Sequence, residues 1–241
     1  MKNVDLKKGL KYGVIFDLDG TLLDSLEDLA DSANHILSLH GFPTHPVDAY
    51  RYFVGDGVRT LFERIMPPEA RDDGETEQCI AEFVARYDLH KEDKTTAYPG
   101  MNSLLKSLKD RGLKIAVATN KVHASVAPLM AKYYPDIRFD AVVGQREGVP
   151  VKPAPQIVHD ILALTGCTAA ETMHVGDTAT DSKNFRRGDM VCLYAYDGTP
   201  DVRSSILYKG SLKEMTANQL VVMLNDGQQN PDIMAPHDGQ T

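Results

Sequence analysis

The sequence has few cysteines, no long apolar run and no excess of basic residues, and each absence excludes a class of protein. Its 241 residues include three cysteines, Cys79, Cys167 and Cys192, which are odd in number and widely spaced. This spacing suits neither a disulfide framework nor a paired metal motif, so we expect reduced thiols and a cytoplasmic protein. No apolar stretch approaches the roughly 18 residues that a membrane helix requires, and we expect no membrane partner.

The charge balance is also informative, because the net charge is −8 at pH 7. An acidic chain lacks the basic face that nucleic acid requires, so we expect no nucleic-acid partner. Residues 1–11 are polar and basic and lack the apolar core of a secretory signal. The oligomeric state stays open between monomer and homodimer.

What the chain does contain is a block of helices set between strands. Apolar spacing predicts helices over residues 25–39, 47–53, 58–66 and 75–90, with no convincing strand among them. From residue 98 onward, helices alternate with strands, which predicts a doubly wound parallel sheet in a Rossmann-like α/β core. We expect strands at 14–16, 114–119, 139–143, 172–175, 190–194 and 206–208, and helices between them at 100–111, 125–133 and 155–164.

These patterns predict two domains and a tail. Residues 1–24 and 94–224 are expected to form the Rossmann-like core, and residues 25–93 a helical domain inserted after the first strand. Residues 225–241, rich in Gln, Asp, Gly and Pro, are expected to be disordered.

The first strand ends in two carboxylates one residue apart, Asp17 and Asp19, followed by Gly20. Buried carboxylates are costly without a partner, and the carboxyl ends of parallel strands form crevices where ligands bind. Gly20 allows a sharp turn and a close approach to a ligand. The pair therefore indicates a ligand site, the alternative being an ordinary strand exit with solvated acids.

Two further segments suggest an oxyanion site. The strand 114–119 stops at Thr119, Asn120 and Lys121, which we expect to place a hydroxyl and backbone N–H groups at the start of the next helix. Thr119 could equally cap that helix. Lys152, in a loop just before a proline, could place a cation over a phosphate or be a solvated loop lysine.

A third strand end carries a second acidic pair. The strand 172–175 leads into Gly176 and Asp177, and Asp181 follows one helical turn later. Two acids in this position suit a hard cation with oxygen ligands, although one of them could cap a helix. The eight histidines show no zinc-binding spacing, and we expect His174, inside the strand, to be structural.

Taken in order, these four segments resemble the motifs of the haloacid dehalogenase superfamily, which consists mainly of phosphatases with a doubly wound core. The resemblance extends to about residue 200, and the helical insertion resembles the cap of family members with this topology. Within the superfamily, residues 54–57 and 119–121 resemble phosphoglycolate phosphatases. The matching motifs are Asp17-Leu18-Asp19-Gly20-Thr21, Thr119-Asn120, Lys152-Pro153 and Gly176-Asp177-Thr178-Ala179-Thr180-Asp181.

The resemblance implies a role for each catalytic residue. Asp17 would attack phosphorus and carry the phosphoryl group, while Asp19 would protonate the leaving oxygen and later accept a proton from water. Thr119, the Asn120 N–H and Lys152 would stabilise the phosphoryl oxygens.

The resemblance also implies a metal and a substrate site. Mg²⁺ would be held by Asp17, Asp177 and the carbonyl of Asp19, with Asp181 close to the ion. In the cap, Gly55 and Gly57 would belong to a loop that closes over the substrate, unless they form only a helix-breaking turn. Arg59 and Lys121 are candidates for binding a substrate carboxylate, although either could be a surface charge.

Together, these observations predict a Mg²⁺-dependent phosphatase that acts on a small phosphorylated metabolite. The expected substrate is 2-phosphoglycolate or a similar phosphomonoester, hydrolysed through an aspartyl-phosphate. A sugar phosphomutase of the same fold is the alternative, because cap contacts decide whether water or a sugar hydroxyl attacks. A non-catalytic protein that binds phosphate ligands would be expected to have lost Asp17 or Asp19, and both are present.

Overall fold

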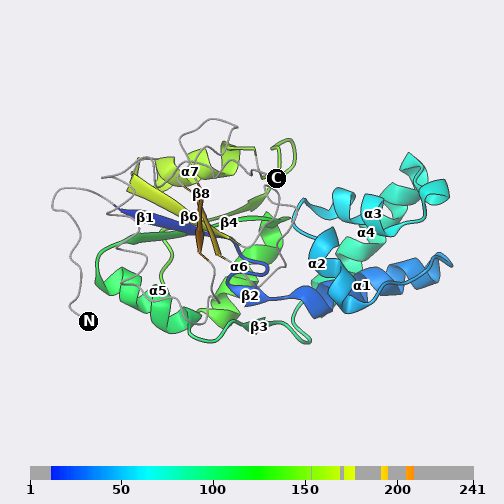
Figure 1. Cartoon of the computed structure of the whole chain (residues 1–241), viewed down its shortest axis with the longest axis horizontal. Coiled ribbons are helices and arrows are strands. Elements are labelled where there is room, and N and C mark those ends of the chain that lie inside the picture. Colours follow the sequence, from blue (N-terminus) through cyan, green and yellow to red (C-terminus); the bar gives the residue numbers. More distant parts are fainter. Residues whose placement is uncertain (1–11, 153, 169–170, 177–190, 195–204, 209–241) are drawn as a thin grey trace, which may run out of the picture.

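The computed structural model describes residues 12–152, 154–168, 171–176, 191–194 and 205–208. Within them, a six-stranded sheet has the order β5-β4-β1-β6-β7-β8 (Figure 1). The strand β1 therefore lies at the centre of the sheet, between β4 and β6. The strands are β1 Gly13–Phe16, β4 Lys114–Val122, β5 Ala141–Gln145, β6 Thr172–Gly176, β7 Val191–Tyr194 and β8 Ser205–Tyr208.

The expected α/β fold is confirmed, but the sheet is not parallel throughout. The strands β5, β4, β1 and β6 are parallel, whereas β7 pairs antiparallel with β6 and β8 antiparallel with β7. Only residues 195–204 connect β7 to β8, which is shorter than the dozen or more residues that a parallel crossover requires. An antiparallel edge on a parallel sheet is common in this fold class.

Helices cover both faces of the sheet, as a doubly wound fold requires (Figure 1). These are α5 Met101–Asp110 and α6 His123–Tyr133 on one face and α7 Gln156–Thr165 on the other. Alternate residues of β4 serve the two sides, because Ile115 and Val117 pack with α5 and α6 while Ala116 and Ala118 pack with α7. The strand β4 is thus buried on both of its faces.

Beside the sheet lies a block of helices with a hydrophobic core of its own (Figure 1). We call this the helical block. Its core contains Ala30, Ile36, Phe62 and Phe83, all at most 2% exposed. Its elements are α1 Leu26–Leu39, η1 Val47–Ala49, α2 Tyr50–Phe53, α3 Val58–Ile65, η2 Pro68–Ala70 and α4 Asp73–His90. The tail expected at 225–241 lies outside the described residues.

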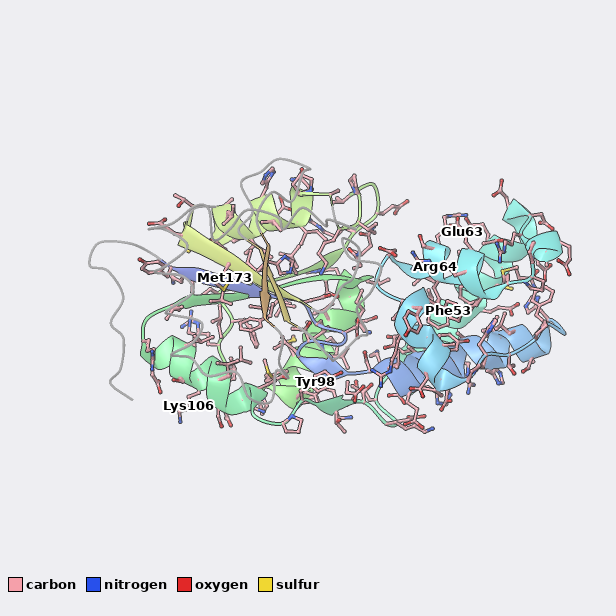
Figure 2. The ribbon with its side chains drawn as sticks, viewed as in Figure 1. Phe53, Glu63, Arg64, Tyr98, Lys106 and Met173 are labelled. Atoms are coloured by element: carbon pink, nitrogen blue, oxygen red, sulfur yellow. The ribbon has the colours of Figure 1, made fainter. Side chains whose placement is uncertain are left out.

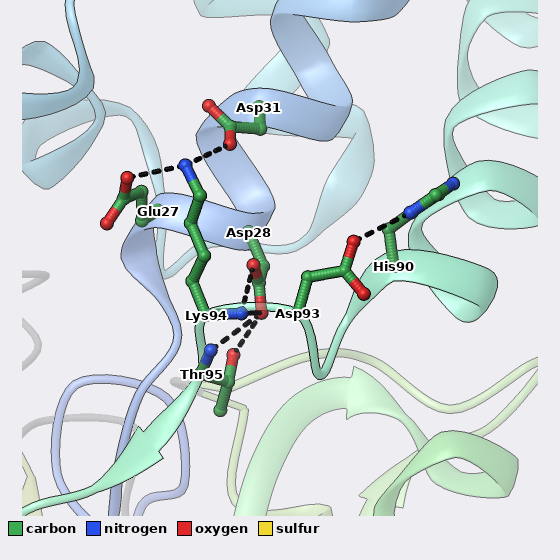
Figure 3. Close-up of polar contacts among 7 residues, drawn as sticks. All are labelled: Glu27, Asp28, Asp31, His90, Asp93, Lys94 and Thr95. Carbon is green, nitrogen blue, oxygen red and sulfur yellow. Dashed lines mark hydrogen bonds and ion pairs between the residues drawn. The ribbon is translucent and has the colours of Figure 1, made fainter.

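Two short strands that the sequence analysis did not predict mark where the chain enters and leaves the helical block. They are β2 Leu23–Asp24 and β3 Thr96–Ala97, which pair antiparallel. Next to them, Asp28 in the first turn of α1 is only 3% exposed. Its carboxylate accepts hydrogen bonds from the backbone N–H groups of Lys94 and Thr95 at 2.9 and 2.8 Å and from the Thr95 hydroxyl at 2.7 Å (Figure 3).

Among the described helices, none is long and apolar enough to cross a membrane. Among the described cysteines, Cys79 and Cys167 are buried and form no disulfide.

Candidate active site

A cavity opens where the carboxyl ends of β1 and β4 face the helical block. On the sheet side it is lined by Asp17, Asp19 and residues 119–122. On the side of the helical block the lining is largely apolar and comes from three helices and the loop between α2 and α3. These residues are Leu29, Val54, Gly55, Gly57, Val58, Leu61, Phe83, Val84, Tyr87 and Asp88.

Asp17 lies directly after β1, and its backbone N–H continues the ladder by donating to the Val175 carbonyl at 2.8 Å. It is 5% exposed. Its carboxylate accepts from the Leu18 N–H at 2.7 Å and forms an ion pair with the Lys152 ammonium at 2.9 Å. A buried carboxylate is tolerated when it is paired and hydrogen-bonded in this way. Solvated acids at a strand exit therefore do not describe Asp17.

The alternative that Lys152 is a solvated loop lysine is wrong. Its side chain is only 11% exposed. The ammonium also donates to the Ala118 carbonyl at 2.8 Å, so it is held against the ends of β1 and β4 together. The chain thus places a buried positive charge beside Asp17.

Asp19 is held by a different set of partners. Its carboxylate accepts from the Ser25 hydroxyl at 2.6 Å and from the Lys121 ammonium at 2.9 and 3.2 Å. The turn between Asp19 and Ser25 begins at Gly20, whose φ of 85° is accessible to glycine without strain. Each of the two aspartates consequently has its own lysine.

Lys121 connects the sheet to the helical block. Its buried ammonium contacts the Tyr87 hydroxyl of α4 at 2.7 Å and lies 4.5 Å from the centre of that ring. Burial lowers the pKa of Lys121, but attraction from Asp19 and Tyr87 outweighs it, and the net shift is upward. Lys121 is therefore a charged, buried residue and not a surface charge. Sequence reasoning missed both Tyr87 and Ser25, because neither belongs to a recognisable motif.

Thr119 differs from the expectation in its local structure. The predicted strand end at Thr119 is wrong, since β4 runs on to Val122 with a register shift between Ala118 and Val122. The helix α6 begins only at His123, so Thr119 does not cap it. The Thr119 hydroxyl instead accepts from the Lys121 N–H at 3.1 Å.

A glycine makes this longer strand possible. A Cβ atom at Gly144 of β5 would lie 2.6 Å from the Lys121 carbonyl oxygen, far closer than real contacts allow. The close approach of β5 to the end of β4 therefore requires glycine at position 144. In the sequence, no motif around Gly144 indicates this close approach.

Asn120 is a second link between the sheet and the helical block. Its side-chain amide donates to the Gly55 carbonyl at 2.9 Å and to the Lys152 carbonyl at 3.1 Å, and its oxygen accepts from the Lys152 N–H at 2.7 Å. The Asn120 side chain thus fixes the Lys152 loop against the loop that contains Gly55.

The loop of residues 54–57 both breaks the helices and lines the cavity. Gly55 and Gly57 have φ values of 117° and 87°, and Gly57 is the residue just before α3. Arg64 holds this loop by donating to the Phe53 carbonyl at 2.9 Å and to the Asp56 carboxylate at 2.5 Å. Figure 2 labels Phe53 and Arg64 on the helices that flank the loop.

Of the predicted site residues, Arg59 does not reach the cavity, and two others lie outside the described residues. Arg59 is half-exposed, forms an ion pair with Glu77 of α4 and is not part of the cavity lining. A helix position that points at α4 cannot be distinguished by sequence from one that points into the cavity. Asp177 and Asp181, expected to bind a metal, lie outside the described residues.

Comparison with known proteins agrees with this geometry. Residues 14–193 match the family described as haloacid dehalogenase-like hydrolase. A phosphoglycolate phosphatase from Pseudomonas putida is 30% identical over 211 residues, which cover 84% of this chain and 77% of the relative. A phosphoglycolate phosphatase from Psychrobacter arcticus is 32% identical over 203 residues, covering 80% of this chain and 88% of the relative.

Solved structures show the same likeness. The crystal structure of a predicted phosphoglycolate phosphatase from Haemophilus somnus superposes with a TM-score of 0.63 at 28% identity. It covers 70% of this chain and 77% of that chain.

Proposed function

This chain belongs to the haloacid dehalogenase-like hydrolase family, and we propose that it is a Mg²⁺-dependent phosphatase of small phosphomonoesters. The observation that carries the proposal is the buried Asp17 carboxylate, which lines a cavity and has the Lys152 ammonium 2.9 Å away. A carboxylate that is desolvated, oriented and open to a cavity suits nucleophilic attack on phosphorus.

In the first step, an Asp17 oxygen forms a bond to phosphorus while the bond from phosphorus to the leaving oxygen breaks. Asp19 gives its proton to that leaving oxygen and becomes a carboxylate. The contacts from Lys121 and Ser25 stabilise Asp19 in this charged form. In the second step, water attacks the phosphorus of the aspartyl-phosphate, Asp19 takes up the proton of that water, and Asp17 and inorganic phosphate are released.

Cations and donors around Asp17 would stabilise the transferring phosphoryl group. Lys152 is already beside the Asp17 oxygen, so its charge can shift towards phosphoryl oxygens as they arrive. The buried Thr119 hydroxyl lines the same cavity and can donate to such an oxygen. Asn120 fixes the loop of Lys152, which limits how far the ammonium can move.

The residues present fit a magnesium ion. Lys152 balances the charge of Asp17, so two additional carboxylates at 177 and 181 would leave an excess of negative charge. We propose that Asp17, the Asp19 carbonyl and Asp177 hold Mg²⁺, with Asp181 close to it, since hard oxygen donors are the ligands this ion prefers. When bound, the ion would neutralise charge on the phosphoryl oxygens.

A melting experiment tests the metal site without relying on activity. Millimolar Mg²⁺ should raise the melting temperature, because a ligand that binds only the folded state stabilises it. The Asp17→Asn variant should show a smaller increase. A wild-type melting temperature that does not respond to Mg²⁺ would contradict the site.

We further propose that residues 25–93 form a cap over the active site and that the substrate is 2-phosphoglycolate or a similar small phosphomonoester. The names of the relatives support this substrate class. Among the described residues that line the cavity, Lys121 is the only cation, so a substrate carboxylate would meet the ammonium that Asp19 and Tyr87 share. The largely apolar lining of the helical block favours a compact substrate that displaces water.

The function is tested by measuring phosphate release from a panel of phosphomonoesters that includes 2-phosphoglycolate and a sugar phosphate. We expect release from 2-phosphoglycolate that depends on Mg²⁺ and is lost in Asp17→Asn. Asp31→Asn, which changes an exposed carboxylate of α1, is the matched control and should be fully active. Formation of a sugar-phosphate isomer instead of inorganic phosphate would identify a mutase and overturn the proposal.

A further inference from the structure

A second group of chemically reactive side chains lies away from the cavity, where the end of α1 meets α4. His40 follows the last residue of α1, and Glu75 and Cys79 come from the first half of α4. The ligand atoms of these three residues all lie within 4.8 Å of one another. The 14 residues of α1 separate this site from β2 by about 20 Å, at 1.5 Å per residue.

Helix geometry places Glu75 and Cys79 next to each other on α4. Glu75 and Cys79 are four positions apart on α4, so their side chains emerge on the same face, one turn apart. Cys79 is fully buried, the His40 side chain is 11% exposed and the Glu75 side chain 34% exposed. The thiol therefore forms the floor of the group, and the carboxylate lies at its opening to solvent.

The two nitrogens of His40 both face carboxylates. Nδ1 lies 2.5 Å from an oxygen of Glu75, and Nε2 lies 2.8 Å from an oxygen of Glu82. A neutral imidazole has a single N–H and can donate to only one of them. When Nε2–H donates to Glu82, the lone pair of Nδ1 points towards the Glu75 carboxylate, and a positive centre is needed between them. That centre is either a second proton or a metal ion.

The donor set decides which metal ion fits. A thiolate, an imidazole and a carboxylate are the ligands of four-coordinate zinc sites, in which a water takes the fourth position. A thiolate is too soft a ligand for the magnesium proposed at the active site. A carboxylate on the far nitrogen of the histidine, as Glu82 provides, is the usual outer partner that fixes the ring of a zinc ligand.

We propose that His40, Glu75 and Cys79 bind a Zn²⁺ ion, with Glu82 orienting the imidazole of His40 through Nε2. The ion joins the end of α1 to α4 and so stabilises the helical block from the side opposite the sheet. It takes no part in the proposed phosphatase reaction, and its presence does not depend on that reaction.

Zinc binding should also release a proton. Burial raises the pKa of the Cys79 thiol to about 11, so that without the ion the thiol is protonated at neutral pH. Coordination requires the thiolate, and the proton passes to the buffer.

Cobalt titration of the full-length protein, with Mg²⁺ present throughout, tests the proposal. Co²⁺ is the spectroscopic substitute for Zn²⁺, and a thiolate ligand gives it a charge-transfer absorption in the near ultraviolet. We expect the wild-type protein to develop this band up to one equivalent and to lose it when Zn²⁺ is added. The variant Cys79→Ser should lack the band, and the matched control Cys167→Ser, which changes another buried thiol, should keep it.

Zinc affinity, measured by competition with a chromophoric chelator, gives a second readout. Cys79→Ser and His40→Gln should each weaken Zn²⁺ binding by at least 100-fold. Glu82→Ala should weaken it by about 10- to 100-fold while leaving the cobalt band in place, since it removes only the outer partner. If Cys79→Ser does not fold, His40→Gln decides between the outcomes.

Two results would overturn the proposal. One is a wild-type protein that shows no thiolate band and no chelator-resistant zinc, in which case His40 is a doubly hydrogen-bonded imidazolium between Glu75 and Glu82. The other is a band that survives Cys79→Ser and His40→Gln, which would place the ion elsewhere. Both results are independent of phosphate release, so they are distinguishable from failure of the proposed function.

Discussion

Two buried carboxylates, one at the entrance to the helical block and one at the end of β1, are stabilised in opposite ways. Asp28 is 3% exposed and Asp17 is 5% exposed. The oxygens of Asp28 accept two backbone N–H groups and a hydroxyl, all from Lys94 and Thr95 (Figure 3). Among the described residues, Asp17 accepts one backbone N–H and otherwise depends on the ammonium of Lys152.

We propose that this difference separates an acid that holds the fold, Asp28, from an acid that reacts, Asp17. Two of the donors to Asp28 are backbone N–H groups, which the chain holds in place, and Asp28 is not part of the cavity lining. The donor beside Asp17 is the end of a flexible side chain, and the carboxylate lines a cavity. A charge balanced by a movable cation can be passed to an incoming phosphoryl group, which a charge balanced by the backbone cannot do.

The largest effect in the comparison of Asp17 with Asp28 is expected when the charge of Asp17 is removed. Asp17→Asn should lower the rate of phosphate release by roughly a thousandfold or more, because the amide is no nucleophile. The variant should still fold, since its side-chain oxygen can accept from Leu18 and Lys152 as before. Phosphate release measures the loss of activity, and a circular-dichroism melting curve of the same preparation checks that the variant folds. Near-normal activity in Asp17→Asn would contradict the proposed role of Asp17 as the nucleophile.

The same substitution at Asp28 should lower the stability of the protein and leave its activity unchanged. In Asp28→Asn, the amide N–H₂ would face donors from Lys94 and Thr95, leaving buried groups without acceptors. We expect the free energy of unfolding to fall by about 3 kcal/mol, as for loss of hydrogen bonds to a buried charge, with activity per folded molecule unchanged. Urea denaturation measures the first quantity and phosphate release the second. An Asp28→Asn protein as stable as wild type would show that this acid does not hold the fold.

The end of β1 should also be more sensitive to acid than the entrance to the helical block, because of His174. This residue of β6 is buried, and burial, together with the charge of Lys152, holds its pKa well below 6.5. The folded state therefore keeps His174 neutral, whereas the unfolded chain takes up a proton as the pH falls through 6.5. Stability is lost on acidification, by about 1.4 kcal/mol at one pH unit below that value.

Urea denaturation at pH 7.5 and pH 5.5 measures the direction and the size of this change in stability. The variant His174→Gln cannot titrate, so the stability of wild type relative to this variant should be lower at pH 5.5 than at pH 7.5. An equal difference at the two values would mean that His174 is not held neutral in the folded protein.

The smallest effect is expected at the exposed charges around the entrance to the helical block. The Lys94 ammonium contacts Asp31 at 2.8 Å and Glu27 at 2.6 Å, and all three side chains are about half exposed (Figure 3). Water screens such pairs, so Asp31→Asn should change the free energy of unfolding by less than about 0.5 kcal/mol. A loss as large as that of Asp28→Asn would mean that burial is not what distinguishes the two residues.

The sequence predicted that the ends of β1 and β4 lie close together, because parallel strands of one sheet bring their carboxyl ends to one edge. Asp17 and Lys152, which are 135 positions apart in the chain, form an ion pair there. The α/β fold and the helices followed from periodicity in the same way. These features depend on local pattern and on topology, and both are visible in a single sequence.

Contacts between the sheet and the helical block could not be predicted in this way. The partners of Lys121 come from the segment after β1 and from α4, and no local pattern links Lys121 to Tyr87. The antiparallel strands β7 and β8 and the continuation of β4 past Thr119 depend on pairing between strands. The periodicity of apolar residues within one strand does not indicate how strands pair. Asp28 looks like any acid in the first turn of a helix, and only the fold shows that it accepts hydrogen bonds from Thr95.

The most direct test of the central claim is to trap the phosphorylated aspartate. Enzyme that is turning over a phosphomonoester is quenched with acid and reduced with borohydride, which converts an aspartyl-phosphate to homoserine. Peptide sequencing by mass spectrometry should find homoserine at position 17 and none at Asp19 or Asp28. Homoserine at another position, or none in an enzyme quenched during a burst of product, would contradict the assignment of Asp17 as the nucleophile.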